Sequence, residues 1–428
     1  MTSRPRAEPS VPRRGRLRSF FGILGPGLVA GAADDDPSGI ATYSKVGARM
    51  GTSMLWTALL TWPLMSVVQF MCARIGMVTG RGLTGALGEK LPKGALIVLS
   101  IALFAVNSIN VGADLAGMSD AAQMLTGIST RSFVVVFGVV VAFVTIGCRY
   151  RQIAKLLKWL ALVLCAYILT AFVVEPNWGK VLRETLAPSW PPGPDAWRNL
   201  VAILGTTISP YLFFWQASQE VEEEKTLGRR MLPWRQGATF REIKNRELDV
   251  GVGTFFSSLV MYFIMLTCAL TLHAHGATEI ETSKQAAEAL RPLAGSLGSL
   301  LYTLGLIGVG LLAIPTLSGS AAYAFAETFH WSQGIDKPLG AARSFYGVVI
   351  GSIALGIGMD LAGIRPLKAL YWTAILNGVL APFLLIAILL VAGDRKIMRG
   401  QPSSVLSRLL VAAVTVLMLA AAAALLVS

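Results

Sequence analysis

Long apolar stretches, separated by short polar ones, run along the whole chain. A helix needs about 20 mainly apolar residues to cross the hydrocarbon core of a bilayer, and eleven stretches approach or exceed that length. Inside a membrane such stretches satisfy their backbone hydrogen bonds by forming helices. The pattern therefore predicts an all-α integral membrane protein with about 11 transmembrane helices. The predicted spans are 22–48, 52–79, 95–124, 132–148, 153–175, 198–222, 249–272, 298–327, 342–359, 368–392 and 405–427.

Two of the predicted spans carry a proline at a similar distance from their start. In the first span Pro37 follows Asp36 and precedes Ser38, and in the sixth span Pro210 follows Ser209 within GTTISPY. These spans are the first members of two five-helix halves if the eleventh span is an addition. Matched interruptions in two halves are typical of inverted-repeat transporters that bind their cargo near the middle of the membrane. The pattern therefore indicates a transporter of this type.

The apolar pattern also predicts the domain organisation. Residues 1–19 are expected to be a disordered, basic cytoplasmic tail, because no signal-peptide cleavage pattern follows them. Residues 20–392 are expected to form the transporter core, with halves at about 20–190 and 191–392. Residues 393–428 are expected to form the eleventh transmembrane helix. No tract is long enough for a separate soluble domain.

Composition agrees with a membrane protein. Hydrophobic residues make up 54% of the 428 residues, charged residues make up 14%, and the mean hydropathy is +0.62. A soluble domain typically carries about 25% charged residues. The net charge of +13 does not indicate a nucleic-acid partner, because the basic residues cluster in short tracts between apolar spans. The expected surroundings are therefore the lipid bilayer, and no obligatory protein partner is evident.

The placement of Lys and Arg predicts the topology. With the N-terminus inside, the inner segments hold 27 of the 37 Lys and Arg residues, and the outer segments hold 10. Cytoplasmic loops carry the excess of positive charge, so we expect a multi-pass protein of the inner or plasma membrane with a cytoplasmic N-terminus and an outer C-terminus. The inner segments are the N-terminal tail, 74–93, 149–158, 225–246, 337–343 and 395–408.

Other polar features are expected to be structural. The tract 222–247 is interpreted as a solvated cytoplasmic face, and a short outer helix is expected within 273–297. His273 and His275 are two candidate metal ligands in that loop, but a pair without a third ligand is more often solvent-facing. The four cysteines are expected to be small core residues. The chain has no nucleotide-binding loop, HExxH motif or paired nucleophile and base, so we expect neither an enzyme nor a cofactor.

The proline in the first span predicts a local ion site. Pro37 lacks an N–H and its ring clashes with the carbonyl of Ala33, so the helix is expected to unwind there, with Gly39 allowing the turn. Carbonyl groups from Ala33 to Asp35 then need partners in a medium of low dielectric constant. A metal cation meets that need, and Asp36 supplies the compensating negative charge.

The sixth span is expected to complete this site. Pro210 frees carbonyls near Thr206 and Thr207, and the hydroxyls of Thr207 and Ser209 lie alongside. Carboxylate, carbonyl and hydroxyl oxygens suit the hard cations Mg²⁺, Ca²⁺ and Mn²⁺. An ionisable residue inside a membrane is by default a functional-site hypothesis. The predicted metal-site residues are Ala33, Asp35, Asp36, Gly39, Thr206 and Ser209.

Asp34 and Asp35 have alternative interpretations. They can contribute to the ion site, line an aqueous vestibule, or pair with a Lys or Arg from another helix.

Four spans contain longer motifs. They are GPGLVAGAADDDPSGIAT in the first span, QFMCARIGMVTGRGL in the second, GADLAGMSDAAQML in the third and ILGTTISPYLFFWQAS in the sixth. These motifs resemble those of one known family, the NRAMP (natural resistance-associated macrophage protein) divalent-metal transporters. The resemblance covers about residues 22–392. It implies a leucine-transporter-like 5+5 inverted repeat with broken helices 1 and 6, and transport of a divalent metal ion as substrate.

The departures from the family pattern favour a hard, partly hydrated cation. Gly39 stands where the family has an Asn ligand, and Ser209 stands where it has a metal-binding Met. Tyr211 replaces a His linked to proton movement, and Gly117 replaces a Glu, whereas Asp114 keeps the family's Asp. The chain is therefore similar to the NRAMP-related magnesium transporter branch, which moves Mg²⁺ and Mn²⁺ without evident proton coupling. The alternatives are a proton-coupled Mn²⁺/Fe²⁺ importer of the parent type and a sodium-coupled organic-solute symporter.

Three further residues are possible accessory positions. The first is Tyr211. The second is Asp114, which is interpreted either as guiding ions or as pairing with a basic residue such as Arg343. The resemblance places an amide in the tenth span, which makes Asn377 a candidate, with Ala374 also possible at that position. The alternative for Asn377 is a hydrogen bond between packed helices.

Overall fold

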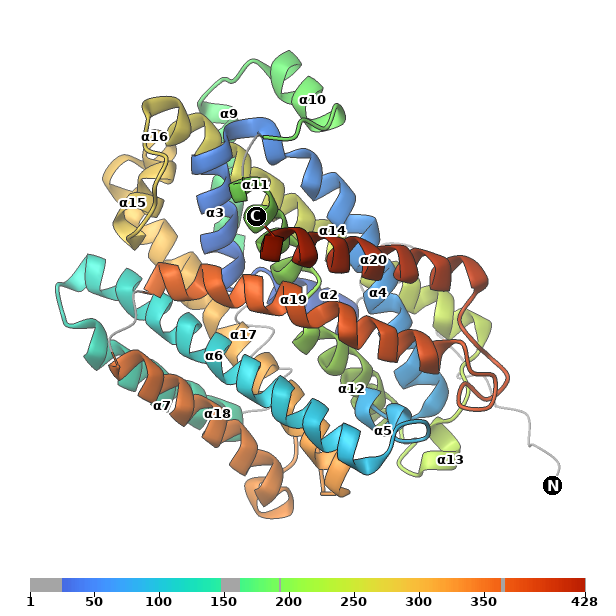
Figure 1. The fold of residues 1–428 in the computed structure, drawn as a ribbon. Helices are drawn as coiled ribbons and strands as arrows, with labels where there is room; N and C mark the ends of the chain where they lie inside the picture. The colour runs from blue at the N-terminus through green and yellow to red at the C-terminus, as the bar shows by residue number, and fades with distance from the viewer. Residues whose placement is uncertain (1–24, 148–161, 192–193, 363–365, 428) are drawn as a thin grey trace, which may run out of the picture.

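The structure is a computed structural model that describes residues 25–147, 162–191, 194–362 and 366–427. Within these residues the secondary structure is helical (Figure 1). The long helices are α2 (Pro26–Asp34) with α3 (Pro37–Met50), α4 (Trp56–Thr79), α6 (Lys93–Thr126), α7 (Thr130–Gly147), α11 (Pro194–Thr207) with α12 (Pro210–Thr226), α14 (Phe240–Thr271), α17 (Gly298–Phe329), α18 (Arg343–Leu361), α19 (Pro366–Ala392) and α20 (Val405–Val427). The shorter helices are α5 (Leu83–Leu87), α9 (Cys165–Val173), α10 (Trp178–Leu186), α13 (Leu232–Arg235), α15 (Ser283–Ala287) and α16 (Arg291–Ala294).

The described helices follow the predicted spans in order. Nine segments of the described residues are long and apolar enough to cross a membrane. The first predicted span appears as the two short helices α2 and α3, and α11 and α12 form the sixth. The fifth predicted span is described only from residue 162, since 148–161 lie outside the described residues. The basic tail 1–19 and Cys148 also lie outside them.

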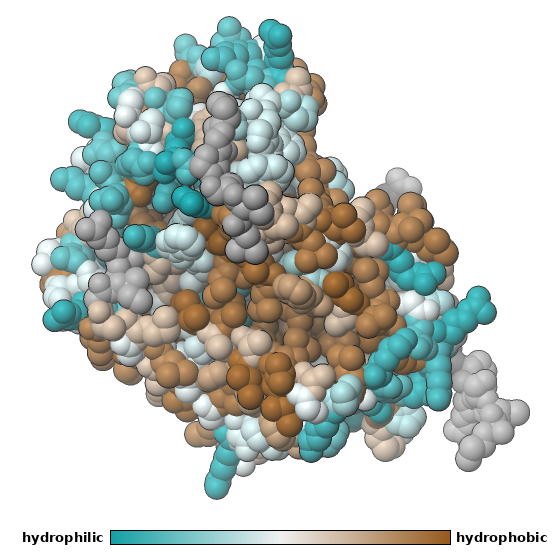
Figure 2. Space-filling view, viewed as in Figure 1, coloured by the Kyte–Doolittle hydropathy of each residue, from teal (hydrophilic) through white to brown (hydrophobic). Residues whose placement is uncertain are grey.

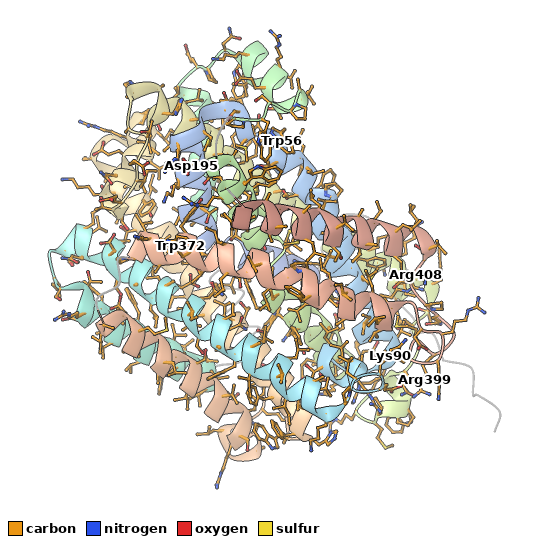
Figure 3. All side chains as sticks on the ribbon, in the orientation of Figure 1. Trp56, Lys90, Asp195, Trp372, Arg399 and Arg408 are labelled. Carbon is orange, nitrogen blue, oxygen red and sulfur yellow. The ribbon has the colours of Figure 1, made fainter. Side chains whose placement is uncertain are left out.

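The bundle has two polar ends and an apolar middle. Figure 2 shows hydrophobic side chains across the middle of this face, with hydrophilic ones gathered over α10, α15 and α16 and near α5 and α13. Lys90, Arg399 and Arg408 lie at the end with α5 and α13, whereas Trp56 and Trp372 lie toward the other end (Figure 3). Trp372 is 49% exposed, as expected for an aromatic residue at a membrane boundary.

Close contacts between small residues hold the broken helices in the bundle. A Cβ atom added to Gly31 of α2 would lie 2.4 Å from the backbone of Gly253 in α14. On the other broken helix, a Cβ atom added to Gly205 of α11 would lie 2.0 Å from the carbonyl oxygen of Ala374 and 2.3 Å from the amide nitrogen of Gly378, both in α19. Small residues let membrane helices approach closely where polar backbone groups must be shielded.

We expect Gly205→Ala to destabilise the protein, because the methyl group must push α11 away from α19. Overpacking of this kind costs about 1–3 kcal/mol. The matched control is Gly251→Ala in α14, where an added Cβ meets nothing within 4 Å. This substitution should raise the helix propensity slightly. Thermal unfolding of each purified variant in detergent gives the melting temperatures to be compared. Equal melting temperatures for the two variants would contradict the close contact.

The loop between α14 and α17 agrees with the predicted short helix. Thr282 caps α15 by accepting a hydrogen bond from the amide of Gln285. His273 contacts the carbonyl oxygen of Ala48 at 2.8 Å, and His275 contacts that of Thr271 at 2.7 Å, each through Nδ1. In both histidines Nδ1 is therefore in hydrogen-bond contact with a backbone carbonyl oxygen. Cys72 and Cys268 are buried, as predicted for core residues, whereas Cys165 is only partly buried.

Candidate metal-ion site

The first break lies at the end of the aspartate run. Helix α2 ends at Asp34, Asp36 has extended backbone angles (φ −70°, ψ 171°), and Pro37 is the first residue of α3. A proline fits the first position of a helix because its missing N–H would have no partner there anyway. The chain therefore breaks before Pro37, as its chemistry predicts.

The predicted role of Gly39 in the turn is wrong. Gly39 lies inside α3, without a positive φ. A Cβ atom at this position would lie 3.3 Å from Oγ1 of Thr206 and 3.3 Å from the ring of Tyr43. The close approach of Thr206 and Tyr43, not the turn, therefore accounts for glycine at this position.

Asp36 lies at the centre of the first break. Its Oδ1 accepts hydrogen bonds from the Ser38 hydroxyl at 2.6 Å and from the Gly39 amide at 2.8 Å, which caps α3. Its Oδ2 is 3.3 Å from the hydroxyl of Tyr211 in α12. The side chain is 2% exposed. The carboxylate is therefore held between the two broken helices and away from bulk water.

Tyr211 also satisfies a backbone group that the break leaves free. Its hydroxyl donates a hydrogen bond to the carbonyl oxygen of Ala33 at 2.9 Å. The prediction that this carbonyl lacks a helical partner agrees with the structure, although a tyrosine supplies the partner here.

The second break has the same form as the first. Helix α11 ends at Thr207, Ser209 is extended (φ −79°, ψ 133°), and Pro210 begins α12. The Ser209 hydroxyl is 2.8 Å from the carbonyl oxygen of Gly205 and 2.7 Å from that of Thr206, so it faces back onto α11. The two breaks meet where the Ser38 and Thr206 hydroxyl oxygens are 3.5 Å apart.

Asp34 and Asp35 face a different helix. The Ser257 hydroxyl of α14 is 2.6 Å from Oδ2 of Asp34 and 3.2 Å from Oδ1 of Asp35. Asp34 is 0% exposed and Asp35 is 5% exposed. The vestibule interpretation is therefore wrong in this structure. Among the described residues neither carboxylate forms an ion pair with a Lys or Arg, so the pairing interpretation is wrong as well.

Asp114 brings a fourth carboxylate to the site from α6. Its side chain is fully buried and lies close enough to Asp36 for the two charges to repel each other. Neither oxygen has a hydrogen-bond partner of ordinary geometry in the described part of the chain. The predicted alternative of a pair with Arg343 is wrong, because Arg343 is exposed at the start of α18. Asp114 therefore has capacity to accept a cation or a proton.

Asn377 pairs with another helix. Its Oδ1 accepts from Nδ2 of Asn110 at 3.2 Å, and its own Nδ2 is 3.4 Å from Oδ1 of Asn110. This reciprocal amide pair joins α19 to α6 and agrees with the helix-packing interpretation. Ala374, the alternative at this position, is buried and its carbonyl packs on Gly205.

The chemistry of the site is that of oxygen atoms in a dry interior. In the described residues no three His, Cys, Asp or Glu side chains already converge as metal ligands. The available donors are the carboxylates of Asp36 and Asp114, the Ala33 carbonyl, and hydroxyls of Ser38, Thr206 and Tyr211. Such a set suits a hard cation that keeps part of its water shell and completes its coordination with water.

A charged network at one end of the broken helices is absent from the sequence predictions. Arg246 belongs to a tract whose pattern predicts a solvated face, but its side chain is only 10% exposed and pairs with Glu220, Glu223 and Asp249. The N–H groups of Gly25, Gly27 and Leu28 at the start of α2 donate to the Asp249 carboxylate at 2.8, 2.8 and 3.1 Å. The available signal was Arg246 and Asp249 at helical spacing where an apolar span begins.

This network joins the three helices that surround one side of the site. Asp249 and Arg246 belong to α14, Glu220 and Glu223 belong to α12, and the bound amides belong to α2. Gln216 of α12 extends the network by donating to Glu220 at 2.7 Å. The network therefore ties the start of α2 to α12 and α14.

Residues 27–428 match the family model described as natural resistance-associated macrophage protein-like. The chain is 23% identical over 399 residues to the divalent metal cation transporter MntH of Erwinia tasmaniensis, covering 91% of this chain and 90% of the relative. It is 25% identical over 395 residues to the protein of the same description from Chromohalobacter salexigens, covering 90% and 86%.

Solved structures show the same fold. A manganese transporter of Eremococcus coleocola superposes with a TM-score of 0.73 at 16% identity, covering 97% of this chain and 89% of that one. Mhp1, a nucleobase-cation-symport-1 family transporter, superposes with a TM-score of 0.58 at 15% identity, covering 90% and 81%. The fold is therefore leucine-transporter-like, which confirms the expectation of an all-α membrane protein with broken helices 1 and 6.

Proposed function

The chain belongs to the Nramp family, whose members are transporters and not enzymes, and from this premise we propose that it carries divalent metal cations across a membrane, with Mg²⁺ as the main cargo and Mn²⁺ as a second one. The observation that carries this proposal is the buried Asp36 carboxylate between two broken helices, surrounded by oxygen donors. A divalent cation compensates the buried negative charge that Asp36 and Asp114 share.

The donor atoms support Mg²⁺ over softer metals. The Ser209 hydroxyl stands where the family pattern has a thioether, and it faces back onto α11. Thioether ligands favour softer transition metals, whereas carboxylate, carbonyl and water suit Mg²⁺ and Mn²⁺. Mg²⁺ is usually bound through one or two carboxylates and keeps several waters. Glycine at position 39 keeps a side chain out of the narrow space beside Thr206 and Tyr43.

In the proposed site Asp36 is the principal ligand. The Ala33 carbonyl joins it when the Tyr211 hydroxyl moves away, and Thr206 contributes from the second break. Asp35 and Ser209 support the two breaks, Asp114 guides the cation from α6, and Asn377 braces α6 against α19. The proposed ligands Asp36, Ala33 and Thr206 all lie at or beside the two breaks.

The site residues are buried, so transport requires alternating access from the two sides. We propose that the two halves of the inverted repeat, about 20–190 and 191–392, move against each other around the site. The Arg246 network closes the inner side by fixing the start of α2. In the proposed topology the N-terminus and the end with α5 and α13 are cytoplasmic, in agreement with the basic residues Lys90, Arg399 and Arg408 at that end (Figure 3).

Transport in this proposal is not strongly coupled to protons. The family pattern has a His and a Glu where this chain has Tyr211 and Gly117. A Cβ atom added to Gly117 would lie 2.8 Å from Cδ1 of Leu370, so an acidic side chain at this position would require the Leu370 side chain to move. The driving force is then the membrane potential, which contributes about 2.3 kcal/mol per charge per 100 mV.

Uptake of Mn²⁺ into proteoliposomes with an internal pH dye tests this proposal. We expect external Mg²⁺ to compete with Mn²⁺ and the internal pH to stay constant. The second candidate is proton-coupled Mn²⁺/Fe²⁺ import, and the description of one solved neighbour as a manganese transporter favours Mn²⁺ as its cargo. Mn²⁺ uptake that ignores a large excess of Mg²⁺ and acidifies the vesicles would establish that candidate and contradict ours.

A further inference from the structure

A cavity lined by basic side chains shares no lining residue with the two helix breaks. It has a volume of about 520 Å³ and is formed between α5, the start of α6 and the ends of α12 and α17. Four basic side chains line it, and Glu327 is the one carboxylate among its lining residues. These helices meet at the end of the bundle that we place in the cytoplasm (Figure 1). The basic side chains are Arg81, Lys93, Lys225 and Lys337.

Two of these cations have no acidic partner in the described part of the chain. Arg81 pairs with Glu89 at 3.4 Å, and Lys225 pairs with Glu222 at 2.7 Å. Lys337 instead donates to the Ser332 hydroxyl at 3.0 Å, and Lys93 lies over the ring of Phe329, 5.9 Å from its centroid. Partial burial and then the charge of Lys225 lower the pKa of Lys337, against the smaller opposite effect of Glu222. With four Lys and Arg side chains against one carboxylate, the lining has a surplus of positive charge.

The carboxylate in the cavity does not remove that surplus. The two oxygens of Glu327 accept hydrogen bonds from the amides of Gly82 at 2.6 Å and Gly85 at 2.8 Å. These bonds fix the carboxylate against the backbone that leads into α5. Lys93 and Lys337 therefore remain available to an anion that enters from outside.

The wall of the cavity is apolar and aromatic. Trp331 is 36% exposed and stacks on Phe329, with ring centroids 5.1 Å apart. Leu91 and Leu96 line the same cavity. A cavity of this size holds a small organic molecule, and basic pockets between membrane helices at the cytoplasmic surface suit phosphate headgroups.

We propose that this cavity binds a phosphate-bearing anion, with Lys93 and Lys337 contacting the phosphate and Trp331 contacting the remainder of the molecule. The source is either the headgroup of an anionic phospholipid at the membrane boundary or a soluble phosphate ester. The site is separate from the ion path and does not depend on which cation the protein carries.

The test measures binding to purified protein in nanodiscs and in detergent, with EDTA present. Nanodiscs of phosphatidylglycerol against phosphatidylcholine test the lipid source by thermal stability, and titration with pyrophosphate in detergent tests the soluble source. We expect one of these probes to stabilise the wild-type protein. The double variant Lys93→Gln, Lys337→Gln should weaken the effect about 30-fold in affinity, and raised ionic strength should weaken it as well.

Two further variants separate the site from general charge and folding effects. The matched control is Lys180→Gln, Lys284→Gln, two exposed lysines of α10 and α15 at the other end. Lys93→Arg, Lys337→Arg should retain binding. Stabilisation by phosphatidylglycerol alone identifies a lipid, and stabilisation by pyrophosphate identifies a soluble ligand. The proposal is overturned if neither probe stabilises the protein, or if the cavity variant and the control respond equally.

Discussion

Asp36→Asn should reduce Mg²⁺ uptake by about 100-fold or more, because removing one partner of a buried charge pair costs about 3–5 kcal/mol. The cation then enters an interior that lacks its principal charge. The substitution keeps the size of the side chain, and asparagine is as good a helix cap as aspartate. The Asn oxygen can still accept the hydrogen bond that Gly39 donates at 2.8 Å, so α3 should still begin at Pro37.

The measurement is uptake into proteoliposomes that contain a Mg²⁺-sensitive dye, with thermal unfolding of each sample as a check on folding. Asp394→Asn is the matched control, since its carboxylate pairs with Lys90 at 3.0 Å on the surface of the bundle. We expect this control to transport normally. Normal uptake by Asp36→Asn, or an equal loss in both variants, would show that the charge at the break is not needed.

Arg246→Met should lower the free energy of unfolding by about 3–5 kcal/mol, because it leaves buried carboxylates without their partner. Glu220 is 1% exposed and Asp249 is 0% exposed, and both contact the guanidinium, at 2.9 and 2.6 Å. The start of α2 is tied to Asp249 through three amides. Loss of the network should therefore also loosen α2 and open the inner side of the site.

Unfolding of the detergent-solubilised protein measures this effect. The control is Arg291→Met, whose pair with Glu288 is exposed (74% and 45%), and we expect a change of about 0–1 kcal/mol there. Adding Glu220→Gln to Arg246→Met should restore part of the stability, since it removes one uncompensated charge. If the network were no stronger than an exposed ion pair, Arg246→Met and Arg291→Met would lower the free energy of unfolding by equal, small amounts.

The spans and breaks could be predicted from the sequence because they depend on local chemistry. Apolar length decides where a helix crosses a membrane, and Pro37 and Pro210 stop the preceding helix because of their own rings. The structure confirms both breaks. The negative charge at the first break also followed from the residues alone.

The partners of the site residues could not be predicted, because they come from distant parts of the chain. Tyr211 lies 178 residues from Ala33, and Ser257 lies 222 residues from Asp35. Only the packing of the helices brings them together. The sequence therefore predicts free carbonyl groups at the first break and leaves a vestibule among the alternatives for Asp34 and Asp35, where the structure has a tyrosine and a buried serine.

Gly39 and Arg246 show a second limit. A glycine after a proline is consistent with a turn, but close approach of Thr206 explains Gly39 in the structure. A basic residue in a charged tract is usually solvated, but burial of Arg246 depends on three acidic partners on two helices. In both cases the reason for the residue is a neighbour that the local pattern does not contain.

We propose that the protein carries Mg²⁺ and that the membrane potential drives this transport. The most direct measurement is Mg²⁺ entry into proteoliposomes with an imposed inside-negative potential and no pH gradient, followed with internal Mg²⁺ and pH dyes. We predict Mg²⁺ entry that increases with the potential while the internal pH stays constant. Absence of Mg²⁺ entry in vesicles that take up Mn²⁺ and acidify would contradict it.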